Sequence, residues 1–224
     1  MKVLAIETAA DPATLALWVG GALFVRRSLE GHSNSSSLLP MLSDCLRDAQ
    51  IGLDDLDGIA FGQGPGSFTG LRVACGLALG LSAARATPLL GVGTLDAMAC
   101  LTRSRRVLAI LDARMREVYA GFFVDGARHG EIGVYSPENL PLPSEGGWLA
   151  CGNGLNIPGV RERLAPFVDA WRPEIAPHAE GVARLAVARF AAGERADHPE
   201  AALLYVRDKV ARTLAEREAE GRNA

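Results

Sequence analysis

The stretch Gly62-Gln63-Gly64-Pro65-Gly66-Ser67-Phe68-Thr69-Gly70-Leu71-Arg72 does most to decide the fold of this chain. It follows an apolar run at 58–61 that predicts a strand, and it precedes a run of small residues at 71–86 that predicts a helix. A strand, a glycine-rich turn and a helix can aim backbone N–H groups at an anion. Glycines also let two backbones approach closely. No Gly-Lys-Ser/Thr follows, so the stretch is not a P-loop, and a phosphate-facing loop and a tight packing turn both remain open.

The composition predicts a soluble globular protein of one large domain or two small lobes. The 224 residues are 49% hydrophobic, and the net charge of −3 argues against autonomous nucleic-acid binding, which usually needs a basic face. No apolar run reaches the roughly 18 residues of a membrane span, and the N-terminal apolar run is too short for a signal peptide. We therefore expect a cytoplasmic protein. Its cysteines form no C-x-x-C pair and are expected to be free thiols: Cys45, Cys75, Cys100 and Cys151.

The first hundred residues predict an alternation of strands and helices. Strands are expected at 3–6, 14–19 and 22–28, the last two joined by a Gly20-Gly21 hairpin. A helix follows, since Leu38, Leu42, Cys45, Leu46 and Ala49 recur at helical spacing. Leu39 and Met41 are interpreted as lying outside that stripe. After the glycine turn and its helix, a strand is expected at 88–92 and a short helix capped by Thr94.

The chain then repeats itself. Residues 107–110 match residues 3–6 letter for letter, and an acid follows each run, Glu7 in the first copy and Asp112 in the second. A second strand and a hairpin turn follow each acid, so we infer an internal duplication. This order predicts the α/β, duplicated ribonuclease-H-like fold of actin, sugar kinases and the Hsp70 ATPase. We expect a first lobe at 1–105, with a terminal helix at 206–224 packing back on it, and a second, reduced lobe at 106–205.

Several motifs along residues 1–120, and one near the C-terminus, make the chain resemble the TsaB (YeaZ) family. The most specific is the glycine stretch itself. The others are Val3-Leu4-Ala5-Ile6-Glu7-Thr8-Ala9, Ala16-Leu17-Trp18, His32-Ser33, Leu39-Pro40, Asp112-Ala113-Arg114-Met115-Arg116-Glu117-Val118-Tyr119 and Tyr205-Val206-Arg207. The family often has a proline shortly before that tyrosine, where this chain has Leu203.

The resemblance implies a non-catalytic scaffold for tRNA modification. A TsaB subunit would pair with its catalytic paralogue TsaD, and the ATPase TsaE would join them, to place threonylcarbamoyl on the adenosine next to the tRNA anticodon. The complex would use ATP and Mg²⁺, while this chain would bind no cofactor alone and would contact tRNA only through the complex. A homodimer is expected for the isolated chain, with no membrane partner.

Histidine spacing argues against catalysis by this chain. TsaD-type relatives carry His-x-x-x-His, a pair that places two metal ligands on one helix face. The matching positions here are Thr94 and Met98, poor ligands for a hard catalytic metal. The four histidines, His32, His129, His178 and His198, provide no such pair. We therefore expect no metal. The rival interpretations are a small-molecule kinase or ATPase of the same fold and a metallopeptidase-like protein.

A second set of residues forms a candidate nucleotide site: Glu7, Thr8, Asp11, Gly64 and Gly66. The alternative is that Glu7 is a relic acid that caps the end of a strand. Asp112 is open to the same two interpretations. His32 lies in a polar loop, where a surface or interface role is favoured over a ligand role.

Two helices form a candidate partner interface through Leu38, Leu39, Met41, Leu42, Arg72, Gly76, Gly80 and Ala84. Glycine in a helix costs roughly 1 kcal/mol relative to alanine, and close helix–helix approach is the usual compensation. The alternatives are packing of this glycine stripe against the chain's own sheet and a local salt bridge for Arg72. The charged stretch 207–217 is either a solvated helix face or a tRNA contact.

Overall fold

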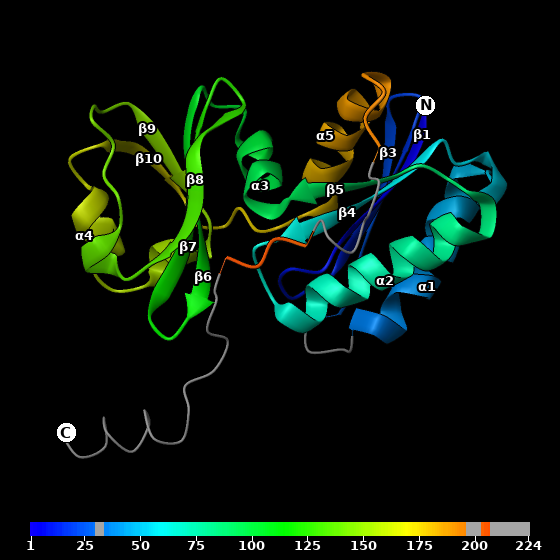
Figure 1. The fold of residues 1–224 in the computed structure, drawn as a ribbon, viewed down its shortest axis with the longest axis horizontal. Coiled ribbons are helices and arrows are strands. Elements are labelled where there is room, and N and C mark those ends of the chain that lie inside the picture. The colour runs from blue at the N-terminus through cyan, green and yellow to red at the C-terminus, as the bar shows by residue number, and fades with distance from the viewer. Residues whose placement is uncertain (30–33, 196–202, 207–224) are drawn as a thin grey trace, which may run out of the picture.

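The computed structural model describes residues 1–29, 34–195 and 203–206, and these form two lobes, each built on a five-stranded sheet (Figure 1). The first sheet has the order β3-β2-β1-β4-β5, and the second has the order β10-β9-β6-β7-β8. The first contains β1 (Lys2–Glu7), β2 (Thr14–Val19), β3 (Ala22–Arg27), β4 (Gly58–Gly64) and β5 (Leu89–Gly93). The second contains β6 (Arg106–Arg114), β7 (Glu117–Val124), β8 (Ala127–Tyr135), β9 (Trp148–Cys151) and β10 (Val168–Arg172).

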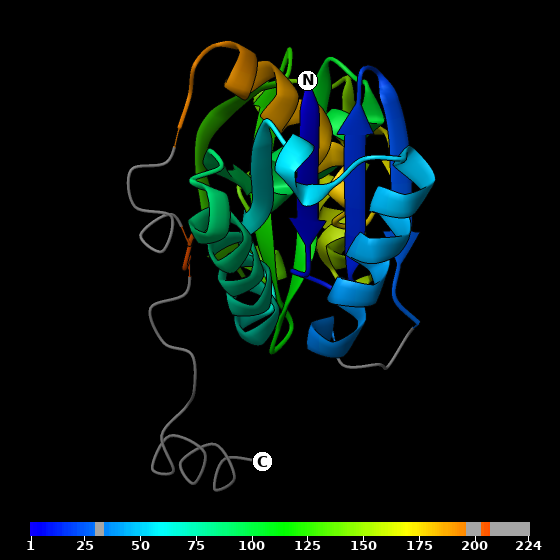
Figure 2. The ribbon, with the colours of Figure 1, turned by 90° about the vertical axis from the view of Figure 1, so that its right-hand side faces the viewer.

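The helices are arranged in layers around the two sheets. In Figures 1 and 2, α1 (Asn34–Ala49) and α2 (Phe68–Arg85) lie side by side on the outer face of the first sheet. The short α4 (Val160–Leu164) lies on the second lobe, on the side away from the first. Between the sheets are α3 (Thr94–Thr102) and α5 (Ala179–Ala191). Three short 3₁₀ turns complete the described structure: η1 (Leu53–Asp55), η2 (Pro137–Asn139) and η3 (Asn153–Asn156).

The repeated tetrapeptide occupies the same place in both lobes. β1 pairs antiparallel with β2 and parallel with β4, and β6 pairs antiparallel with β7 and parallel with β9. Alternate side chains of a strand point to opposite faces. Leu4 and Ile6 therefore enter one core with α1 and α2, while Val3 and Ala5 enter another with α5. The structure thus confirms the duplicated ribonuclease-H-like fold.

The last helix of each lobe packs against the sheet of the other. α3, which follows β5, lies against β6, β7 and β9, whereas α5, which follows β10, lies against β1, β2 and β4. The two helices also contact each other, and a Cβ at Gly181 would overlap the carbonyl group of Ala97. The division at residue 105 falls between the strands of the two sheets, and α3 and α5 form contacts on both sides of it.

Other expectations differ in detail. The second lobe contains α4 and β10, which the sequence did not predict. Gly93, not Thr94, stands at the N-cap of α3. The terminal helix, His32 and His198 lie outside the described residues. None of the helices in the described part of the chain is long and apolar enough to span a bilayer.

Candidate functional site

The glycine turn is anchored to the end of β1. Ser67 caps α2 by accepting a hydrogen bond from the Gly70 N–H at 3.2 Å, and the Ser67 N–H donates to the Ala9 carbonyl at 2.8 Å. The Thr8 hydroxyl donates to the Gly70 carbonyl at 2.6 Å. A Cβ on Gly66 would collide with Ala9, and one on Gly70 would overlap the Thr8 carbonyl oxygen. These contacts account for the glycines by close backbone packing, which favours the packing interpretation of the turn.

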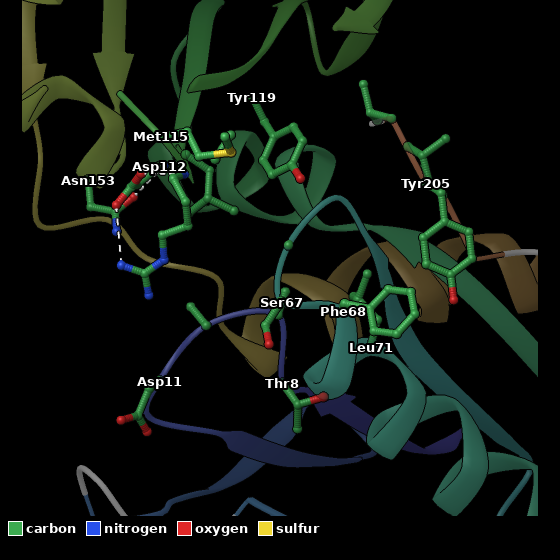
Figure 3. A pocket seen from close by; sticks show the side chains of 18 residues that line it. Thr8, Asp11, Ser67, Phe68, Leu71, Asp112, Met115, Tyr119, Asn153 and Tyr205 are labelled. Carbon is green, nitrogen blue, oxygen red and sulfur yellow. Dashed lines mark hydrogen bonds and ion pairs between the residues drawn. The ribbon is translucent and has the colours of Figure 1, made fainter. Parts of the chain in front are cut away.

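A cleft of about 630 Å³ lies between the two lobes beside this turn (Figure 3). The first lobe lines it with Thr8, Asp11, Ser67 and Phe68, among others. The opposite wall comes from the strand-end turns of the second lobe, and the segment 204–206 contributes a third side. The principal side chains of these two walls are Asp112, Met115, Tyr119, Asn153 and Tyr205.

The cleft brings together only part of the candidate nucleotide site. Thr8, Asp11 and Gly66 line it, but Glu7 and Gly64 do not. Gly64 has a φ of +106° and lies under the backbone of Leu204, whose carbonyl oxygen would be 2.9 Å from a Cβ at Gly64. A glycine at this position allows the left-handed backbone conformation and the close approach of Leu204.

Glu7 is 1% exposed and points into the protein rather than into the cleft. Its Oε1 accepts from the Ala9 N–H at 2.8 Å, and its Oε2 accepts from the Thr94 hydroxyl at 3.3 Å. Burial raises the pKa of Glu7 to about 7, although these hydrogen bonds oppose the shift. A Cβ on Gly62 would collide with the Glu7 carboxylate. The structure thus favours a strand-end capping role for Glu7 over direct contact with a ligand.

Asp112 of the second lobe corresponds to Glu7 of the first, but it lines the cleft. Its Oδ1 accepts from the Arg114 N–H at 2.7 Å, so each acid receives the N–H of the residue two positions later. The Asp112 N–H donates to Asn153 Oδ1 at 2.9 Å, which ties this turn to η3. Asn153 is a cleft residue that the sequence did not single out.

Thr94 and Met98 are fully buried on α3. The Thr94 hydroxyl is directed at Glu7, and Met98 belongs to the core cluster between α3 and the second sheet. No three His, Cys, Asp or Glu side chains gather into a metal-binding group among the residues that the structure describes.

The candidate interface on α1 needs correction. Leu38, Met41 and Leu42 are 1%, 7% and 3% exposed, because they pack into the core of their own lobe. Met41 follows Leu38 by three positions, so it lies on the same helix face and not outside the stripe. Leu39, at 58% exposure, is the residue of this set that remains at the surface.

The candidate interface on α2 faces solvent. Arg72, Gly76, Gly80 and Ala84 are exposed, and a Cβ at Gly76 or Gly80 would meet no atom within 4 Å. The opposite side of the helix, with Leu71, Ala74, Cys75 and Ala78, is buried. The glycine stripe therefore does not pack against the chain's own sheet, and Figure 2 shows α2 on the outside of the molecule.

The comparisons with known proteins agree with this architecture, in which two sheets of the ribonuclease-H-like type enclose a cleft. Residues 29–132 match the TsaD family model, described as tRNA N6-adenosine threonylcarbamoyltransferase. The tRNA threonylcarbamoyladenosine biosynthesis protein TsaB of Escherichia coli (strain K12) is 33% identical over 223 residues, covering 94% of this chain and 96% of that protein. The solved structure of YeaZ from Pseudomonas aeruginosa superposes with a TM-score of 0.82 at 34% identity, covering 91% of this chain and 99% of that one. The chain belongs to the TsaB (YeaZ) family.

Proposed function

We propose that this protein takes part in tRNA threonylcarbamoyladenosine biosynthesis as a non-catalytic subunit that pairs with TsaD. The biosynthetic role is carried by the TsaB relatives, whose name states it. The pairing is supported by the outer face of α2, which we assign to TsaD, with TsaE joining the pair. In the absence of TsaD, the same face would join two copies of this chain. The chain would contact tRNA only as part of the complex.

The exposed stripe Gly76 and Gly80 is the observation that carries the pairing. An exposed glycine within a helix costs roughly 1 kcal/mol relative to alanine, and nothing within the described chain compensates for that cost at either position. A second helix laid across the stripe could approach more closely than the usual 8–10 Å between axes. Leu39 on the neighbouring α1 adds exposed apolar surface beside it.

Two features of the site support a non-catalytic role. The positions where TsaD-type proteins would hold a metal are the buried Thr94 and Met98. The N–H groups of Ser67, Gly70 and Leu71 are already bonded within the turn or to Ala9, which leaves them unsuited to cradle a phosphate. We propose on this basis that the chain alone binds no metal or nucleotide, and that ATP and Mg²⁺ act elsewhere in the complex.

Reconstitution tests this proposal. Purified TsaD, TsaE, ATP and threonylcarbamoyl-adenylate are mixed with unmodified tRNA, with or without this chain, and modified adenosine is measured by mass spectrometry. The chain alone should give no modification, whereas its addition to the mixture should restore it. Equal modification without the chain would contradict a scaffold role.

The cleft favours a second candidate, an ATP-dependent enzyme of the same fold, because Thr8, Asp11 and Gly66 still line it. Calorimetric titration of the isolated chain with ATP and Mg²⁺ distinguishes the two. The scaffold proposal expects no binding. Saturable binding that is lost in Asp11→Ala, together with ATP hydrolysis, would favour the enzyme.

A further inference from the structure

Residues 203–206, named here the strap, lie on the first lobe although they come from near the end of the chain. The Leu204 N–H donates to the Gln63 carbonyl at 2.8 Å, next to the glycine turn. The Leu203 side chain packs against the core beneath α1 and α2. These two contacts fix the backbone of the strap beside the end of β4.

The strap places Tyr205 against the first turn of α2. The rings of Tyr205 and Phe68 lie with centroids 5.7 Å apart and planes inclined by 44°, and Figure 3 shows the two rings side by side. The Arg72 guanidinium carbon lies 3.3 Å from the Phe68 ring centroid and 5.3 Å from that of Tyr205. Arg72 therefore contacts both rings through cation–π interactions, which restrict a side chain that would otherwise sample many rotamers.

Arg72 belongs to the same helix face as the glycine stripe. Residues 72, 76 and 80 are spaced by four, and residues four apart lie one above the other on a helix. No acid in the described part of the chain forms an ion pair with Arg72. The Arg72 guanidinium thus presents its N–H donors at one end of the outer face of α2, next to the glycines at 76 and 80, which have no side chains.

We propose that the strap is part of the TsaD-binding face, and that Tyr205 and Phe68 hold the Arg72 guanidinium in position to meet a carboxylate of TsaD. This inference rests on the proposed pairing with TsaD. Arg and carboxylate form strong, often bidentate hydrogen bonds, and a guanidinium held in advance loses less freedom on binding. Tyr205 is a positioning residue, since it acts through Arg72.

The isolated full-length chain provides the first test, because it needs no partner. The NMR resonance of the Arg72 side-chain Nε–H reports the rings around it. Tyr205→Ala should shift that resonance, whereas Tyr205→Phe, which retains a ring, should leave it near its original position. An unchanged Arg72 resonance in Tyr205→Ala would overturn the stacking of the strap on α2.

Calorimetric titration with purified TsaD provides the second test. Tyr205→Ala should weaken binding by about 2- to 5-fold, the loss of one exposed cation–π contact. Arg72→Met should weaken it by about 10- to 150-fold, the loss of charge-assisted hydrogen bonds. Tyr205→Phe should bind like the original chain, and so should Leu142→Ala, which truncates a similarly exposed side chain, 43% against 44%, in the second lobe.

A double variant shows whether Tyr205 acts by positioning Arg72 or by contacting TsaD itself. If Tyr205 acts through Arg72, adding Tyr205→Ala to Arg72→Met should cause no further loss of affinity. Equal losses in both backgrounds, or an unchanged affinity in Tyr205→Ala, would overturn the inference while leaving the pairing with TsaD intact. Failure of the unmutated chain to bind TsaD would instead overturn the proposed function, and the interface role of Arg72 with it.

Discussion

The two lobes share a strand core but differ on their outer faces. In each, the repeated Val-Leu-Ala-Ile strand lies at the centre of a five-stranded sheet, with antiparallel and parallel neighbours in the same order. The first sheet is covered by α1 and α2, of 16 and 18 residues. Among the residues that the structure describes, the outer side of the second sheet carries the five-residue α4 and short 3₁₀ turns.

This difference in helix cover shows which surfaces of the fold can bind a partner. Alternate side chains of the central strands are buried on opposite faces, so a substitution at any of these positions disturbs one of the cores. The outer helices have one buried face and one free face, and only the free face can acquire a partner without cost to the core. Within the described ranges, the long outer surface of small residues lies on α2 of the first lobe.

The largest expected effect comes from two glycines of α2 with opposite surroundings. A Cβ at Gly70 would overlap the Thr8 carbonyl oxygen, so Gly70→Ala should lower the free energy of unfolding by about 3 kcal/mol. A Cβ at Gly76 meets no atom within 4 Å, so Gly76→Ala should raise it by about 1 kcal/mol. Urea denaturation of the isolated chain measures both. Equal effects would show that α2 has no distinct inner and outer faces.

The next effect concerns the buried acid of the first lobe. Burial raises the pKa of Glu7 in the folded chain to about 7, against 4.5 for a glutamate in water. The free energy of unfolding should therefore fall as the pH rises from 4.5 to 7. The full loss is about 3 kcal/mol. In Glu7→Gln the amide oxygen can still accept from Ala9, and no charge develops, so this fall should disappear.

Urea denaturation at intervals between pH 4 and pH 8 checks this prediction. The stability of Glu7→Gln relative to the original chain should increase across that range. A constant difference between the two proteins would mean that Glu7 titrates normally and is not held in a dry environment.

Local sequence patterns predicted the strands of the first lobe well, because these strands are short apolar runs bounded by turn residues such as Gly20-Gly21. They failed wherever the answer depends on a partner distant in sequence. The packing of α3 and α5 against strands of both sheets and the stacking of Tyr205 on Arg72 are of this kind. Met41 is different, because its position three residues after Leu38 already indicated that both side chains lie on the buried face of α1. The predicted apolar stripe should have included it.

The smallest expected effect lies in the hairpin between β6 and β7. Arg114, Met115 and Arg116 have φ values of +66°, +54° and +59°, although none is glycine. The left-handed region costs L-residues roughly 1–2 kcal/mol each, so Arg116→Gly should raise the free energy of unfolding by about 1 kcal/mol. In the first lobe the β2–β3 hairpin already has Gly20 and Gly21 at positive φ, and Gly21→Ala should destabilise it. Thermal melting of both variants checks the contrast; a loss of stability in Arg116→Gly would contradict it.

The affinity of Gly80→Leu for TsaD tests the central claim most directly. Leucine at this open position should leave the melting temperature of the isolated chain nearly unchanged, because no atom lies within 4 Å of its Cβ. In the complex it should overpack the contact by about 1–3 kcal/mol, which weakens binding roughly 5- to 150-fold. Gly146→Leu, at an equally open glycine of the second lobe, is the matched control and should bind normally. Unchanged affinity of Gly80→Leu for TsaD, or equal losses in the two variants, would contradict the account.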